Sequence, residues 1–126
     1  MENNKAFQFI TKLIISSIAV LTSAYILPGV HVENFTTALV VAAVLAFLNA
    51  FLKPLLIIFT IPFTVITLGL FLLVINAVII IVTDNLIDGF EVRNFWWALL
   101  FSLILSLTTS VFEAIGGLNN NNNRIE

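Results

Sequence analysis

The chain contains no cysteine, only three prolines and five glycines among its 126 residues, and few charged side chains. The lack of cysteine excludes disulfides, thiolate metal ligands and a cysteine nucleophile. Charged residues make up 10% of the chain, whereas a soluble domain carries about 25%. The formal net charge of −2 offers no basic surface of the kind that binds nucleic acid.

Motifs for catalysis are also missing. His31 is the only histidine, so no histidine pair exists to hold a metal or to activate a serine. No Gly-x-Ser-x-Gly turn and no glycine-rich phosphate-binding loop occurs. We interpret His31 as a solvated loop residue beside Glu33. The sequence therefore predicts no enzyme, no cofactor, no metal site and no small-molecule substrate.

Long apolar runs dominate what is present. Hydrophobic residues make up 60% of the chain, and the mean hydropathy is +1.13. Between Thr36 and Thr83 the only formally charged residue is Lys53. Since a membrane-spanning helix needs about 20 apolar residues, this run alone supplies two. The apolar stretch after Lys5 and Lys12 can also be read as a cleaved signal peptide, but the repeat described next requires it as a resident helix.

Two segments 60 residues apart share the pattern Gly-x-x-Val-x-Asn-Phe, at residues 29–35 and 89–95. Internal repeats of this kind point to a duplicated structural unit. We interpret each unit as a helix, a short loop and a second helix. The two units cover about residues 9–53 and 69–113.

The residue types of the two shared loops suit a turn that leads into a helix. Gly29 and Gly89 supply the backbone freedom that a turn requires. Asn34 and Asn94 precede the next apolar stretch, where an asparagine side chain can accept a hydrogen bond from the first turn of a helix.

The fold class expected from this pattern is an all-α membrane protein with four transmembrane helices, arranged as two repeated helical hairpins. The helices are predicted at about residues 7–27, 35–52, 63–83 and 95–112, within a single transmembrane domain of residues 1–115. Prolines break helix continuity in residues 54–62, which we interpret as a short interfacial or re-entrant segment before the third helix. A straight helix from Leu55 is the alternative. Residues 116–126 are predicted to be a disordered, asparagine-rich tail.

Basic residues set the expected orientation. With both termini cytoplasmic, Lys5, Lys12, Lys53 and Arg124 lie inside and only Arg93 lies outside, as the positive-inside bias favours. A five-span arrangement is the alternative, but it would orient the two repeats oppositely and lose this bias. The lipid bilayer is the expected surrounding partner.

Small residues recur at every fourth position of the second and fourth predicted helices. Such ridges let membrane helices approach closely, so we expect these two helices to pack around a pseudo-two-fold axis or to join subunits of a homo-oligomer. The eight equivalent positions are Ala38, Ala42, Ala46, Ala50, Ala98, Ser102, Ser106 and Ser110.

Few polar side chains fall inside the predicted spans. Asn76 lies near the middle of the third helix, and its amide is expected to face the bundle or a neighbouring subunit, because an unbonded amide in hydrocarbon is costly. It is interpreted as a contact between helices, with a polar pathway as the alternative. Lys53 and Glu113 occupy equivalent positions of the two repeats; they are expected either to reach water separately or to pair.

The central stretch resembles a known family. Asn49-x-x-x-Lys53-Pro54, followed by a Thr-Leu-Gly pattern that begins at Thr67 and by the pair Asn76-Ala77, is similar to the four-span phage-holin-like membrane proteins, the mycobacterial-type holin superfamily IV. The resemblance covers about residues 10–112. It implies a protein of the bacterial cytoplasmic membrane that oligomerises and permeabilises it, and it supplies no catalytic residues.

Three functions follow from these observations. The first is a holin-like, oligomerising protein that permeabilises the membrane. The alternatives are a non-lytic membrane protein of envelope stress or a partner subunit, and a small transporter built from parallel repeats. Only a thin polar stripe is available on the fourth helix; we therefore expect a small ion-conducting assembly, or a lesion shared with lipid, rather than a wide protein-lined hole.

Overall fold

The computed structural model describes residues 5–116, and most of them are helical. This part of the chain forms five helices and two short strands, in the order α1 (Lys5–Ile26), β1 (Val30–Val32), α2 (Phe35–Phe59), α3 (Ile61–Ile66), α4 (Phe71–Leu86), β2 (Phe90–Val92) and α5 (Phe95–Gly116). Gly116 is still helical, and the rest of the predicted tail lies outside the described residues.

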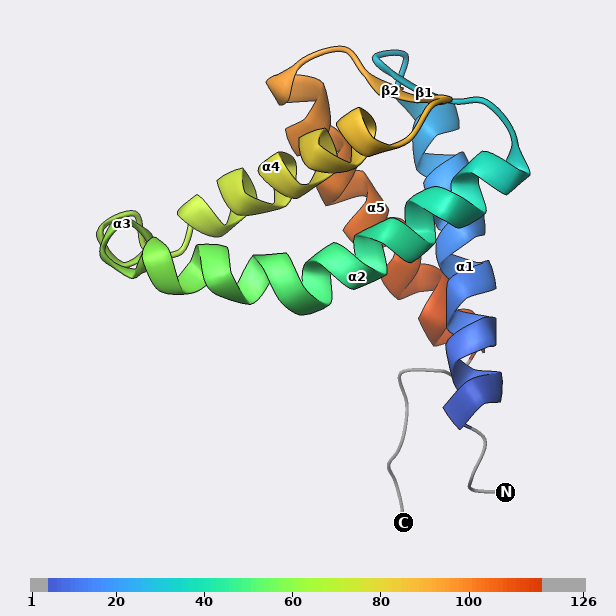
Figure 1. The fold of residues 1–126 in the computed structure, drawn as a ribbon, viewed down its shortest axis with the longest axis horizontal. Coiled ribbons are helices and arrows are strands. Elements are labelled where there is room, and N and C mark those ends of the chain that lie inside the picture. The colour runs from blue at the N-terminus through green and yellow to red at the C-terminus, as the bar shows by residue number, and fades with distance from the viewer. Residues whose placement is uncertain (1–4, 117–126) are drawn as a thin grey trace.

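The helices form two arms that diverge from the strands. Figure 1 shows α1 and α5 leading away from β1 and β2 in one direction, and α2 and α4 leading away in another, with α3 at the far tip. We call α1 with α5 the terminal arm, and α2 to α4 the central arm. Helices pack together within each arm, and α1 also packs on α2 as α4 does on α5.

Three helices, α1, α2 and α5, are long and apolar enough to cross a membrane. The shortest of them has 22 residues and is about 33 Å long at 1.5 Å per residue. The fourth apolar helix, α4, has 16 residues, or about 24 Å. Large apolar side chains such as Phe47 and Phe51 point outward with about three-fifths of their surface exposed, at 61% and 62%. Lipid is the solvent that such a surface requires.

The two loops of the sequence pattern pair with each other as an antiparallel ribbon. Val30 lies opposite Val92, and His31 lies opposite Glu91. Just beyond the ribbon, two further hydrogen bonds join residues that are 60 apart in the chain. Glu33 N donates to Gly89 O, and Arg93 N donates to Gly29 O, each at 2.8 Å. The all-α expectation therefore omitted a small β element.

The break between the two central helices lies later than expected. Helix α2 was expected to end near residue 52, but it continues past Pro54 to Phe59. The third predicted helix is divided, since α3 ends at Ile66 and α4 begins at Phe71. Between them the chain turns at Leu68 and Gly69, with φ angles of 57° and 90°. Residues 54–62 are therefore almost entirely helical, and a straight helix from Leu55 is not formed.

The core lies where the arms meet beneath the ribbon. Phe90 and Phe101 are fully buried, and their ring centroids are 5.7 Å apart. Ala38 and Ala98, the first alanines of the two ridges, are also fully buried. Small side chains where the two arms meet let the helices approach closely. The arms separate with increasing distance from the ribbon.

Candidate functional site

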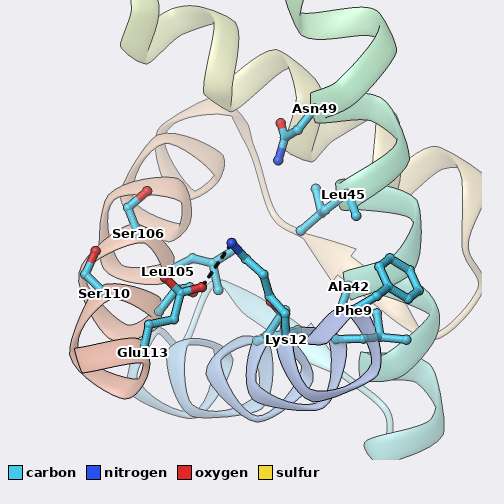
Figure 2. A pocket seen from close by; sticks show the side chains of 14 residues that line it. Phe9, Lys12, Ala42, Leu45, Asn49, Leu105, Ser106, Ser110 and Glu113 are labelled. Carbon is cyan, nitrogen blue, oxygen red and sulfur yellow. Dashed lines mark ion pairs between the residues drawn. The ribbon is translucent and has the colours of Figure 1, made fainter. Parts of the chain in front are cut away.

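A cavity of about 600 Å³ opens between the two arms. Its walls come from α1, α2 and α5, as Figure 2 shows. The inner walls are largely apolar, with Leu45 and Leu105 among them. Seven of its side chains are polar: Lys12, Ser16, Asn49, Ser106, Thr109, Ser110 and Glu113.

An ion pair crosses the cavity from α1 to α5. Lys12 Nζ lies 3.4 Å from Glu113 Oε2. The pairing of Lys53 with Glu113 considered from the sequence is not the one formed. Since α5 packs against α1 and not against α2, Glu113 meets the lysine of its own arm. Repeat equivalence drew attention to Lys53 but gave no information on which helices are neighbours.

The two ridges of small residues do not pack on each other. Within residues 5–116, α2 contacts α1 and α4, whereas α5 contacts α4 and α1. The expectation that the second and fourth predicted helices, α2 and α5, pack on each other within one copy is therefore wrong. Burial divides each ridge in the same way: Ala38, Ala42, Ala98 and Ser102 are buried near the crossing, whereas Ala46, Ala50, Ser106 and Ser110 are exposed.

The exposed halves of the ridges lie on opposite sides of the cavity. Ala46 contributes from α2, and Ser106 and Ser110 contribute from α5. Asn49, the first residue of the central sequence pattern, also lines this cavity. Asn76 is half-buried in α4, and it is not one of the cavity-lining residues. The amide at the cavity is thus that of Asn49, which the fourfold spacing of the α2 ridge did not single out.

The loop residues take structural roles at the ribbon. Asn34 Oδ1 accepts a hydrogen bond from Thr37 N at 2.8 Å, and Asn94 Oδ1 accepts one from Trp97 N at 3.1 Å. Gly89 has a φ of 92°, a conformation that glycine adopts without strain. Gly29 does not need a positive φ; a Cβ there would overlap the indole ring of Trp97.

A second, more polar hollow of about 410 Å³ lies beside the ribbon. His31, Asp84, Glu91 and Arg93 are among its lining residues. Asp84 Oδ2 accepts a hydrogen bond from Val92 N at 3.2 Å, which ties the end of α4 to β2. In the part of the chain that the structure describes, no group of three or more metal-ligating side chains forms. The cavity between the arms is therefore the stronger candidate site.

This cavity brings opposite charges, hydroxyls and an amide together inside a bundle of apolar helices. Such groups are costly in hydrocarbon unless they meet water, an ion or another polar partner. The arrangement is therefore suited to holding or passing polar species at the membrane.

Comparison with known proteins identifies relatives. The family described as mycobacterial 4 TMS phage holin, superfamily IV, matches residues 7–111. The uncharacterized membrane protein YvlD of Bacillus subtilis is 42% identical over 80 residues, which are 63% of this chain and 67% of YvlD. The uncharacterized protein SCO3922 of Streptomyces coelicolor is 38% identical over 86 residues, 65% of this chain and 69% of that protein. No solved structure matches the chain.

Proposed function

Because the chain belongs to the mycobacterial 4 TMS phage holin family, superfamily IV, we propose that it assembles with further copies in the bacterial cytoplasmic membrane and lets small ions cross. The chain is a multi-pass membrane protein. Its topology, its assembly and its activity are proposed below.

The proposed topology has four crossings, made by α1, α2, α4 and α5, with both termini on the cytoplasmic side and α3 embedded at the cytoplasmic edge of the bilayer. The ion pair between Lys12 and Glu113 supports this arrangement, because it holds the terminal ends of α1 and α5 together. Lys5, Lys12 and Lys53 then lie toward the cytoplasm, and Arg93 of the ribbon lies outside, as the positive-inside bias favours.

The proposed architecture is a tandem repeat with a pseudo-two-fold axis through the pair His31 and Glu91. Three observations support it. The ribbon is centred on this pair, whose members are 60 residues apart. The hydrogen bond from Glu33 N to Gly89 O has an equivalent from Arg93 N to Gly29 O, in which each residue is replaced by the one 60 positions away. The caps by Asn34 and Asn94 are likewise equivalent.

The observation that carries the proposed activity is the polar lining of the cavity. Lys12, Asn49, Ser106 and Glu113 lie among apolar helices, where an unpartnered polar group is destabilising. Water and ions in the cavity would satisfy them. One copy supplies only a thin polar lining, and further copies are needed to complete a pathway, which makes the expected conduit narrow.

The exposed halves of the ridges offer the contact for assembly. Ala46 and Ala50 on α2 and Ser106 and Ser110 on α5 are exposed in a single copy. Close packing against small residues is a main source of helix association in lipid. A second candidate, a small transporter, is supported by the position of the cavity between two similar halves, a place where transporters built from repeats bind substrate.

The experiment is inducible expression in a bacterium with continuous recording of membrane potential, together with ion flux into vesicles that contain the purified chain. Depolarisation on induction and concentration-dependent ion flux are the expected results. Fully polarised cells at high expression and ion-tight vesicles would favour the non-lytic alternative. Saturable uptake of one solute, without general ion flux, would favour the transporter.

A further inference from the structure

The two members of the ion pair at the cavity are unequally solvated. The Lys12 side chain is 64% exposed, whereas that of Glu113 is 13% exposed. Glu113 Oε2 is buried and accepts no hydrogen bond from residues 5–116, so its contact with Lys12 is a charge contact only. A carboxylate has room for about four hydrogen bonds. Oε2 of the Glu113 carboxylate therefore lacks a hydrogen-bond donor within residues 5–116.

The cavity beyond this pair is amphipathic. Figure 2 shows Lys12 and Asn49 pointing into it from α1 and α2, and Glu113 reaching from α5 toward Lys12. Apolar walls with Leu45 and Leu105 continue behind the polar groups. Its volume of about 600 Å³ lies within the range of ligand cavities, roughly 300–1,000 Å³.

We propose that this cavity binds one phospholipid whose headgroup is zwitterionic and carries a primary ammonium. The ammonium would donate hydrogen bonds to Glu113, and the phosphate would accept them from Lys12 and from a nearby hydroxyl such as that of Ser110. An acyl chain would cover Leu45 and Leu105. Hydrogen bonds between charged groups are shorter and stronger than neutral ones, and this headgroup supplies both charges in one molecule.

The donor shortage of Glu113 selects among lipids. A primary ammonium has three N–H donors, whereas a choline group has none and cannot satisfy the carboxylate. An anionic headgroup such as that of phosphatidylglycerol would bind Lys12 through its phosphate, but it offers Glu113 only neutral hydroxyl donors, which form weaker hydrogen bonds than an ammonium. Neither headgroup supplies both a phosphate for Lys12 and a cationic donor for Glu113.

The surroundings of the cavity favour a lipid over a soluble molecule. Phe9, Phe47 and Leu107 are apolar side chains of α1, α2 and α5 that are each at least 60% exposed, so the lining helices present themselves to hydrocarbon. A water-soluble amine phosphate would fill the polar end and leave the apolar walls uncovered. The proposed lipid would use the same polar groups as the proposed ion pathway, and its retention is measured separately from ion flux.

The test uses the full chain in nanodiscs of phosphatidylethanolamine, phosphatidylcholine or phosphatidylglycerol. After transfer to mild detergent, retained lipid is counted by native mass spectrometry. We expect phosphatidylethanolamine to be retained at least about tenfold better than the other two, the factor that the loss of one hydrogen bond to a charged group produces. Equal retention of the three lipids would overturn the proposal.

Variants connect the preference to the site. Glu113→Gln removes the acceptor charge and should abolish the preference, whereas Lys53→Met neutralises a charge on α2 that does not line the cavity and should leave it intact. A folded Glu113→Gln variant with undiminished preference would contradict the proposal. Should that variant not fold, the unmodified chain still gives the answer: lipids with one, two and three N-methyl groups lose one N–H donor at a time, and retention should fall at each step.

One further measurement tests for a soluble occupant. Soluble phosphoethanolamine should not displace the bound lipid, because it lacks acyl chains; displacement at millimolar concentration would assign the cavity to a soluble ligand.

Discussion

Gly29 faces the indole ring of Trp97 so closely that a Cβ at this position would overlap it. The glycine lies in the turn between α1 and β1, and the tryptophan lies in the first turn of α5. Their contact thus fixes how the ribbon meets the terminal arm. It also places a large aromatic ring beneath Arg93, whose guanidinium carbon is 5.8 Å from the ring centroid.

The first prediction concerns this contact. Gly29→Ala should destabilise the fold by about 1–3 kcal/mol, the usual cost of inserting an extra group into a packed site. The measurement is thermal unfolding in detergent, with abundance in membranes as a second readout. Gly116→Ala is the matched control, because the added methyl would lie 3.7 Å from Ile15 Cδ1, an ordinary contact. Equal stability of the two variants would show that Trp97 moves aside without cost.

The second prediction concerns the two helix caps. Asn34 and Asn94 each accept a hydrogen bond from the first turn of the following helix. Replacing either with alanine should cost about 1 kcal/mol, and replacing it with serine should cost less, because serine also caps helices well. Urea or thermal unfolding of the four single variants measures both effects. If serine and alanine destabilise equally, the hydrogen bonds contribute nothing.

The first and last helices of this protein could be predicted from its sequence, whereas the packing partners of the helices could not. Long apolar runs report helix length in a membrane directly, and α1 and α5 begin and end close to the expected residues. The ribbon was missed because each strand has three residues and its partner lies 60 residues away. Nothing in the local pattern of so short a segment distinguishes a strand from a loop.

The candidate site depended on the same missing information. The ridges were visible in the sequence, but which helices lie side by side decides whether they touch or face a cavity. Pro54 illustrates a second limit. Proline usually breaks a helix, yet α2 continues through it, and the actual turn depends on the backbone of Leu68 and Gly69. Local propensity identified a break in this region but not its position.

The third prediction concerns the tip of the central arm. No charged residue lies between Lys53 and Asp84. Two of the three threonine hydroxyls at the tip bond to the backbone instead of needing water, whereas Thr64 Oγ1 is buried without a hydrogen-bond partner in residues 5–116. Thr60 Oγ1 donates to Leu56 O at 2.7 Å, and Thr67 Oγ1 donates to Phe63 O at 2.9 Å. Where a helix is interrupted within the bilayer, the free polar groups of its backbone need hydrogen-bond partners from the protein itself. We therefore expect the tip to remain within the bilayer and not to reach the cytoplasmic solution.

A chain without cysteine allows a direct measurement of this depth. Leu68→Cys should react slowly with a membrane-impermeant maleimide in inside-out vesicles, because the thiolate needed for reaction forms poorly in hydrocarbon. Gln8→Cys, on the terminal arm, should react fast. The side chain of Leu68 is 92% exposed on the protein, so detergent should make both positions equally reactive. Fast labelling of Leu68→Cys in intact vesicles would place the tip in water.

The last prediction concerns assembly through the exposed parts of the ridges. Ala46→Leu and Ser106→Leu should each weaken oligomers severalfold, because a larger side chain separates helices that approach through small residues. Ala43→Leu is the matched control: Ala43 is exposed on the same helix as Ala46 but does not line the cavity. Chemical crosslinking in membranes across a range of expression levels measures the effect. A loss of oligomers in all three variants would indicate a general sensitivity to bulk, and unchanged crosslinking in all three would move the subunit contact away from the ridges. The contact is located at the cavity only if oligomers are lost in Ala46→Leu and Ser106→Leu and retained in Ala43→Leu. All three residues are exposed, but only Ala46 and Ser106 line the cavity.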